Sequence, residues 1–540
     1  MRPANRPVAL LFAGAALLMP SLPGSAHAPA GTVELDERAI GSVQFDTSCA
    51  EQTRQSFNRG IALLHSFWFD ASIAAFEAVL KTDPTCAMAE WGIAMSHWGN
   101  PLNTKRPKRS LLPGSEAVAR ASSLGTKDER ESLYIEAVAE LYRDFETTPD
   151  HPRAVAFEKA MSKIVERYPN DTEAAIFYAM ALNGTADLKD KTYAQQIRAA
   201  EILERAFEEQ PNHPGIAHYI IHSYDAPALA ERALPAARQY AGIAPAAPHA
   251  LHMPSHTFTR LGHWQDSIDT NLLSAKAAKK ANSPAEVLHA YDYMVYGYLQ
   301  TAQDDAARSV LDKTAAVFEQ VPPDDRYVVA GAYAAAAVPA RYALERGDWA
   351  RAASIEPVAS PAPFVNAIVY FAQGLGAARN GNLADARAAH ENLSRLADTP
   401  GQSAYWAEQV DIQRAVVQAW IELAEGKSDQ ALASMAATAE REDATEKSGI
   451  SPGPLAPARE LLGEMLLQLG KPTEALAAFR ATIEKEPGRF RGLFGGALAA
   501  EAAGRPELAK QYFAKLLQNC ERSAPGRPEL AKAKAFVAAN

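Results

Sequence analysis

Histidines gather in one part of this sequence. Seven of the 13 lie in the two stretches "HPGIAHYIIHSYDAP" and "HALHMPSHTFTRLGHW". Each stretch holds a pair four residues apart, His218 with His222 and His252 with His256. On a helix such residues share one face, with Cβ atoms about 5–6 Å apart. Imidazole is a preferred ligand of zinc, copper, iron and nickel. The spacing therefore favours a transition-metal site if the two helices are neighbours.

The segments around these pairs are predicted to be helical. Apolar residues recur with a period near 3.6, strand-like alternation is nearly absent and alanine is abundant, which predicts an all-α protein. The segments 57–84, 461–487 and 493–517 each combine a helical pattern holding a small residue, a turn and a second helical pattern. The small residues recur at intervals of 34, as from Gly60 to Ala94.

These marks resemble the tetratricopeptide repeat, a helix–turn–helix unit of 34 residues. The resemblance implies a right-handed superhelical α-solenoid of about 11–12 hairpins, because one hairpin cannot bury its apolar face alone. It also implies that the first helix of each hairpin lines a concave wall. The segments "HSFWFDASIAAFEAVLKTDPTCAMAEWGIAMS" and "HMPSHTFTRLGHW" resemble, more narrowly, a group of exported bacterial repeat proteins. That narrower resemblance implies a fold and a compartment but no activity.

The N-terminus has the pattern of a secretory signal. Arg2 and Arg6 precede the apolar run 8–19, and a segment ending in small residues follows. This order predicts a signal peptide, 1–28, cut after Ala28, and a periplasmic or secreted protein. The other expected divisions are an extended segment, 29–52; a solenoid block, 53–447, with an insertion at 99–127; a linker, 448–455; and C-terminal hairpins, 456–540.

Composition limits the classes of partner. The formal net charge is -10 at pH 7, which argues against nucleic acid or an anionic membrane as the main partner. After the signal no stretch approaches about 20 apolar residues, so the protein is not expected to be membrane-embedded. In an oxidising compartment Cys49 and Cys86 are expected to form a disulfide, with Cys520 left over. The alternative is that all three cysteines are free and buried.

The repeat register places the histidines on the inner wall. In the family that the sequence resembles, three positions of the first helix face the groove: six before, three before and one after the small residue. For the hairpin anchored at Ser255 these positions hold His249, His252 and His256. The preceding hairpin holds His218 and His222. First helices of adjacent hairpins pack about 8–10 Å apart. We therefore expect His218, His222, His252 and His256 to surround one metal ion.

Further side chains of the same wall are candidate ligands or hydrogen-bond acceptors for the imidazoles. They are His249, His289, Asp225, Asp292, Tyr296, Met180 and Asn183. The Met180 thioether would favour copper over zinc. Pro254 removes a helical N–H between His252 and His256, so the helix is expected to start late or to kink there. His213 and His263 fall outside the inner positions and are expected to be turn or capping residues.

Three functions remain open from the sequence. The first is an exported repeat protein that binds a transition metal, copper or zinc, in a histidine-lined pocket. The second is a scaffold whose groove holds an unidentified protein or peptide partner or a small ligand. The third is a metal-dependent hydrolase, with Asp225 or Asp292 as the base. No catalytic residue is assigned, since HExxH is missing and nothing brings a nucleophile to a base. The histidines could also only hydrogen-bond between stacked helices.

Overall fold

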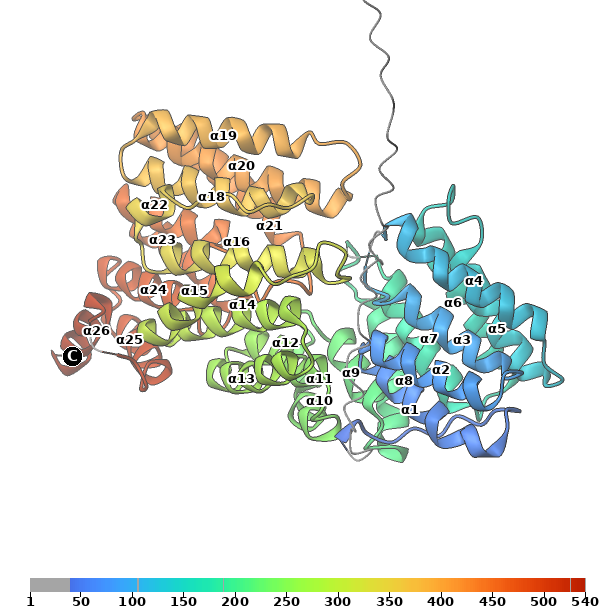
Figure 1. Ribbon diagram of the computed structural model, residues 1–540. Coiled ribbons are helices and arrows are strands. Elements are labelled where there is room, and N and C mark those ends of the chain that lie inside the picture. Colours follow the sequence, from blue (N-terminus) through green and yellow to red (C-terminus); the bar gives the residue numbers. More distant parts are fainter. Residues whose placement is uncertain (1–38, 104–105, 188, 525, 540) are drawn as a thin grey trace, which may run out of the picture. The chain divides into compact units, whose positions relative to one another are not determined.

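The structure is a computed structural model that describes residues 39–103, 106–187, 189–524 and 526–539. The predicted signal peptide, 1–28, and the first part of the predicted extended segment lie outside the described residues. Within the described ranges the regular elements are helices and no strand occurs. Among these helices none has the length and apolar character needed to cross a membrane. The fold is an all-α superhelical solenoid (Figure 1).

Consecutive helices pair into hairpins, twelve of them in the described residues, followed by a single last helix. A short 3-10 helix, η2 (Glu51–Thr53), precedes the first hairpin. Helices α11 and α12 together form the first helix of the sixth hairpin. The helices are α1 (Arg54–His65), α2 (Phe69–Thr82), α3 (Ala87–Trp98), α4 (Lys108–Leu124), α5 (Glu129–Tyr142), α6 (Asp150–Arg167), α7 (Thr172–Thr185), α8 (Ala194–Glu209), α9 (Pro214–Ser223), α10 (Ala230–Ile243), α11 (Pro248–His252), α12 (Pro254–Leu261), α13 (Trp264–Lys280), α14 (Pro284–Gln300), α15 (Asp304–Phe318), α16 (Val328–Glu345), α17 (Trp349–Ala353), α18 (Pro363–Arg379), α19 (Leu383–Ala397), α20 (Ala404–Ala424), α21 (Ser428–Asp443), α22 (Ala458–Gln468), α23 (Pro472–Lys485), α24 (Phe490–Ala502), α25 (Pro506–Asn519) and α26 (Pro528–Ala539).

A buried aromatic ring explains the small residues of the repeat. The Phe76 ring on α2 lies against the first helices of two successive hairpins. A Cβ atom added to Gly60 on α1 would lie 2.8 Å from this ring, and one added to Gly92 on α3 would lie 2.4 Å from it. Because such contacts are too close, only glycine lets both helices approach Phe76. Phe479 on α23 lies in the same way against Gly463 and Gly495, so the same packing rule recurs near the other end of the chain.

Two predicted interruptions have other roles in the structure. The predicted insertion at 99–127 contains α4, which packs against α3 as the second helix of that hairpin. The predicted linker 448–455 belongs to a longer non-helical segment, 444–457, between α21 and α22. We call residues 444–457 the crossing segment. Most of its residues from Ser451 onward are buried, because they pack against distant hairpins.

The C-terminal hairpins pack back onto the middle of the chain. Figure 1 shows α24 to α26 (red) beside α13 to α15 (green). Trp264 Nε1 donates to the carbonyl oxygen of Gly488 at 3.0 Å, and the Phe490 N–H donates to Gln300 Oε1 at 2.8 Å. An ion pair joins Arg527 to Asp304 at 2.6 Å. These contacts hold the two distant parts of the solenoid together.

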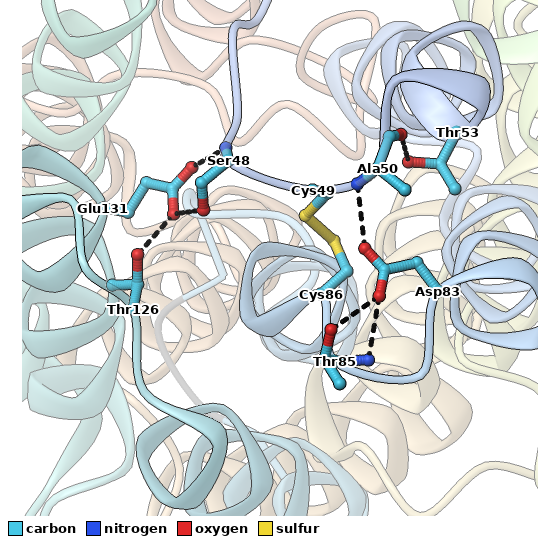
Figure 2. Close-up of a disulfide and its surroundings, with 9 residues drawn as sticks. All are labelled: Ser48, Cys49, Ala50, Thr53, Asp83, Thr85, Cys86, Thr126 and Glu131. Carbon is cyan, nitrogen blue, oxygen red and sulfur yellow. Dashed lines mark hydrogen bonds between the residues drawn. A yellow bond between two sulfur atoms is a disulfide. The ribbon is translucent and has the colours of Figure 1, made fainter.

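A disulfide ties the start of the described chain to the first two hairpins (Figure 2). Cys49 and Cys86 are bonded, with Cα atoms 5.0 Å apart, while Cys520 is free and buried. Beside the disulfide, the Asp83 carboxylate accepts from the Ala50 N–H at 2.9 Å, and Glu131 accepts from the Ser48 hydroxyl at 2.6 Å. The segment before η2 is thereby fixed to α5 and to the loop between α2 and α3.

Candidate metal-binding site

The histidine pairs lie on the first helices of two successive hairpins. His218 and His222 are on α9, His252 ends α11, and His256 is on α12. The chain breaks its helix at Met253, because Pro254 begins α12 and has no N–H to donate. His213 and His263 stand at the N-caps of α9 and α13, at the capping positions that the sequence indicated.

Six histidines come together in two groups of three. Group A is His218, His222 and His249, and group B is His252, His256 and His289. In each group one ligand atom from every residue lies within 4.8 Å of the others. The sequence predicted one centre of four imidazoles, and the structure arranges them differently. The ring centroids of the i, i+4 partners are 4.8 and 5.1 Å apart, whereas those of His222 and His256, which belong to different groups, are 6.0 Å apart.

The two i, i+4 pairs meet through the same atom. Nε2 of His218 lies 3.1 Å from Nε2 of His222. Nε2 of His252 lies 3.1 Å from Nε2 of His256. Each group is completed by a ring from the first helix of the following hairpin: His249 on α11 for group A and His289 on α14 for group B. Both groups therefore follow one plan, repeated one hairpin further along the chain.

Hydrogen bonds on the opposite ring nitrogen fix three of the rings. His218 Nδ1 lies 2.6 Å from the His65 carbonyl oxygen, and His252 Nδ1 lies 2.7 Å from Asn271 Oδ1. His256 Nδ1 lies 2.9 Å from Asp225 Oδ2. Carbonyl and carboxylate oxygens only accept hydrogen bonds. The hydrogen of each neutral ring is therefore on Nδ1, and its Nε2 carries a free lone pair.

In group B no hydrogen lies between the two Nε2 atoms that face each other. The orientation of Asn271 is set because its Nδ2 donates to the Ser267 carbonyl oxygen at 2.7 Å, which leaves only Oδ1 for His252. With both hydrogens on Nδ1, the Nε2 lone pairs of His252 and His256 point at each other. Two acceptors at this distance repel, and a cation that both can coordinate removes the repulsion. Outer acceptors of this kind orient histidine ligands in metalloproteins.

Burial keeps all six imidazoles neutral. His218, His252 and His256 are at most 2% exposed. Desolvation lowers the pKa of every ring in both groups, and it takes those of His218 and His289 to about 3. For His256 the ammonium group of Lys447 adds to this effect, against the opposing carboxylate of Asp225. Neutral imidazole is the form that binds metal ions.

The third ring of each group is accessible and unsatisfied. His249 and His289 are partly exposed, as is His222. In the described part of the chain, His249 Nε2 and His289 Nδ1 have no hydrogen-bond partner. Buried polar atoms are nearly always paired, and one nitrogen in each group is therefore free to bind a ligand.

Among the additional candidates from the sequence, His249 and His289 belong to the two groups, and of the others only Asp225 reaches a histidine group. Asp225 accepts from His256 and also pairs with Arg260 and Lys447, both at 2.9 Å. Asp292 lies instead in a fully buried ion pair with Arg341 at 2.6 Å. Its position on α14 is the predicted one, but a cation from α16 takes up its charge.

The remaining candidates also have partners away from the two groups. Tyr296 accepts from Arg489 at 3.2 Å. Asn183 donates to the Ser223 hydroxyl at 2.8 Å. Met180 is buried in the hydrophobic core of the N-terminal hairpins. These contacts give the three side chains structural roles between helices.

Several residues around the groups were not predicted from the sequence. Phe67, which follows α1 with a positive φ of 54°, stacks on His249 with ring centroids 5.3 Å apart. The Tyr293 hydroxyl lies 3.3 Å from His256 Nε2 and donates to the Ser451 carbonyl oxygen at 3.1 Å. Asn271 is one helix away from His252. No local pattern could have identified these residues, because each lies in a connection or on another helix than the ring it contacts.

The crossing segment covers the inner side of group B. Lys447 reaches Asp225, and Glu446 accepts from the Tyr193 hydroxyl at 2.8 Å. Further along, Arg341 donates to the Pro454 carbonyl oxygen at 3.1 Å. The segment thus contacts α14, α16 and the ends of α9 and α12. This part of the inner wall is occupied by the protein's own chain.

A third histidine cluster is fully satisfied and has a structural role. Glu173 on α7 pairs with His65 at 3.0 Å and with His213 at 2.8 Å. His65 Nδ1 also lies 3.0 Å from the Tyr219 hydroxyl, and His213 Nδ1 accepts from the Ile216 N–H. Every nitrogen of this cluster has a partner within the protein. It links α1, α7 and α9, and it places the His65 carbonyl that orients His218.

Comparison with known proteins agrees with the repeat architecture. The tetratricopeptide repeat family matches residues 416–481 and 460–528, which span α21 to α25 and the adjoining part of α20. The chain therefore contains tetratricopeptide repeats in this part, and such repeats form scaffolds that bind protein partners. No curated protein matches the chain.

Similar solved structures are also helical repeat proteins of low identity. "Human IFIT1 dimer with m7Gppp-AAAA" is 12% identical, with a TM-score of 0.35, over 80% of this chain and 90% of that chain. "APC/C hetero-tetramer Cut9-Hcn1" is 12% identical, with a TM-score of 0.31, over 90% and 95%. At such TM-scores these likenesses carry no argument about ligands or partners.

Proposed function

We propose that this protein binds transition-metal ions through groups A and B. The observation that carries the proposal is the distance of 3.1 Å between His252 Nε2 and His256 Nε2, since the acceptors beside both Nδ1 atoms leave a lone pair on each Nε2. Copper and zinc both suit a site built of imidazole nitrogens. Acceptors that bind Nδ1 of these rings hold each Nε2 in place, so the ligands would already be oriented when a metal ion binds.

A purely structural role for the histidines accounts less well for this arrangement. Where histidines only join helices by hydrogen bonds, each donor is paired with an acceptor, as in the cluster of Glu173, His65 and His213. Groups A and B instead leave one nitrogen in each without a partner and, in group B, set acceptor against acceptor. Unsatisfied buried groups of this kind cost free energy, and a bound ion would recover it.

The hydrolase alternative lacks a base. Asp225 is engaged by His256, Arg260 and Lys447. Asp292 is buried against Arg341. Neither carboxylate is placed to take a proton from a metal-bound water, so we assign a binding role to the site.

A partner-binding role fits the tetratricopeptide repeats, and we place it away from the histidines. The crossing segment already fills the inner wall beside group B. The hairpins that match the repeat family, residues 416–528, remain the part of the chain where a protein partner would dock.

We also propose that the protein is exported to the periplasm or secreted. The basic, apolar and small-residue order of residues 1–28 supports export, and so does the disulfide between Cys49 and Cys86. Mass spectrometry of the protein from its native compartment tests this. A mature N-terminus directly after Ala28 is expected, and an intact N-terminus in the cytoplasm would contradict export.

Metal content and titration test the binding proposal. Protein purified without chelators or a histidine tag should contain copper or zinc, or take up the added ions with micromolar or tighter affinity. A His222→Ala/His256→Ala variant, which removes one ligand from each group, should lose this binding. The matched control is His151→Ala/His263→Ala, which removes two histidines outside both groups and should bind normally.

A second variant separates loss of ligands from loss of fold. His249→Ala/His289→Ala also removes one ligand from each group, and neither His249 Nε2 nor His289 Nδ1 has a hydrogen-bond partner in the described structure. Its helical content and melting temperature should match the wild type while its metal affinity falls. Wild-type protein that takes up neither copper nor zinc would overturn the proposal.

A further inference from the structure

We infer that groups A and B are two separate sites that hold a pair of copper(I) ions. The inference rests on the proposed function and adds to it the number of ions and their charge.

Each group is complete in itself. One nitrogen from each of its three rings lies within 4.8 Å of the other two. Between the groups, the ring centroids of His222 and His256 are 6.0 Å apart, and so are those of His249 and His252. Imidazole nitrogens sit about 2.0–2.1 Å from a bound zinc ion and at similar lengths from copper. Because the six rings divide into two such clusters of ligand atoms, the arrangement favours one ion in each.

The repeat explains why there are two sites. Group A takes its i, i+4 pair from α9 and its third ring from α11. Group B takes its pair from α11 and α12 and its third ring from α14. Successive hairpins place equivalent residues at equivalent positions of the inner wall. When two successive hairpins carry histidines at these positions, the site occurs twice.

The charges around the groups favour ions of low charge. Among the described residues, neither group includes a carboxylate. The nearest one, Asp225, is already balanced by Arg260 and Lys447. Two neighbouring divalent ions would repel each other about four times as strongly as two monovalent ions at the same distance, because the energy scales with the product of the charges. Nothing among the ligands offsets that repulsion.

The number of ligands agrees with copper(I). Zinc in structural sites takes four ligands in a tetrahedron, whereas copper(I) is stable with three. Imidazole is a good ligand for copper, and each group offers three neutral rings. A pair of copper(I) ions therefore satisfies both the ligand number and the charge.

An anaerobic titration with copper(I) and a chromophoric copper(I) chelator as competitor tests this inference. The wild-type protein should bind two copper(I) ions per chain. His249→Ala and His289→Ala should each bind one, because each variant removes a ligand from one group only. The control His390→Ala removes another histidine with an unpartnered buried nitrogen, and it should still bind two. In a parallel zinc titration the second ion should bind at least tenfold more weakly than the first.

The possible outcomes separate the inference from the proposed function. One copper(I) ion per chain, lost in both His249→Ala and His289→Ala, would mean a single shared centre and would overturn the inference alone. Two zinc ions bound with equal affinity would overturn the assignment to copper(I). Failure to bind either metal would overturn the proposed function itself.

Discussion

Replacing Asn271 by alanine tests how the protein orients the imidazole of His252 for metal binding. Asn271 touches no metal position, but its Oδ1 accepts from His252 Nδ1 at 2.7 Å. Without this acceptor the ring can turn, or carry its hydrogen on Nε2, where a metal ion would bind. Loss of such an outer partner typically lowers metal affinity about 10–100-fold, which corresponds to about 1.4–2.7 kcal/mol. We expect an effect of this size in Asn271→Ala.

The matched control lies on the same helix. Ser274 on α13 donates to the Pro248 carbonyl oxygen at the start of α11 at 2.9 Å. Both Asn271→Ala and Ser274→Ala therefore remove a buried hydrogen bond between α13 and α11, and each should cost about 1–2 kcal/mol of stability. Only Asn271→Ala removes a bond to an imidazole. Calorimetric titration with zinc or copper, together with urea unfolding of the metal-free proteins, measures both effects.

The two variants must differ in affinity but not in stability. If Asn271→Ala binds metal as tightly as the wild type, the acceptor does not orient His252 and the account of group B is wrong. If Ser274→Ala loses as much affinity as Asn271→Ala, the effect comes from general loosening of α11 and not from the imidazole.

Three further predictions concern stability. Removing the disulfide in Cys49→Ser/Cys86→Ser should cost about 4 kcal/mol in urea unfolding, since its sequence separation is 37 residues. Burial raises the pKa of Glu173, but the imidazoles of His213 and His65 lower it to about 2. Because that pKa is below the ordinary value, Glu173 adds about 3 kcal/mol above pH 4.5, and the advantage over Glu173→Gln should vanish as pH falls towards 2. Gly92→Ala should cost about 1–3 kcal/mol, measured by thermal unfolding, because its Cβ would lie 2.4 Å from the Phe76 ring.

Each of these three predictions has a result that contradicts it. A reduced or doubly substituted protein as stable as the wild type would mean that the Cys49–Cys86 loop is already ordered when unfolded. A stability difference for Glu173→Gln that persists at pH 2 would mean that the carboxylate charge is not what stabilises the cluster. A neutral Gly92→Ala would show that Phe76 can move away.

The local regularities of the fold could be predicted from the sequence. The intervals of 34 residues identified the hairpins, and the register placed His218 and His252 on successive first helices. What the sequence could not give was the grouping. The ring centroids of the i, i+4 partners are 4.8 and 5.1 Å apart, whereas those of His222 and His256 are 6.0 Å apart. The predicted single centre assumed that all four rings could reach one point.

The ion-pair partners of Asp292 and Asp225 could not be predicted from the sequence. Asp292 was expected at the metal, yet Arg341, on the next first helix, lies against it in a dry environment. Asp225 meets Lys447 across 222 residues of chain, because the crossing segment returns to the inner wall. No periodic pattern in the sequence indicates that the crossing segment packs against the inner wall. A carboxylate on a predicted inner face is therefore a weak indication of a ligand until the cations around it are known.

The most direct test of the metal site is a crystal structure of copper-loaded protein, with anomalous diffraction recorded on both sides of the copper absorption edge. The account predicts an anomalous peak within group A and another within group B, each surrounded by three imidazole nitrogens. Peaks confined to other histidines, or no ordered copper at either group, would contradict it.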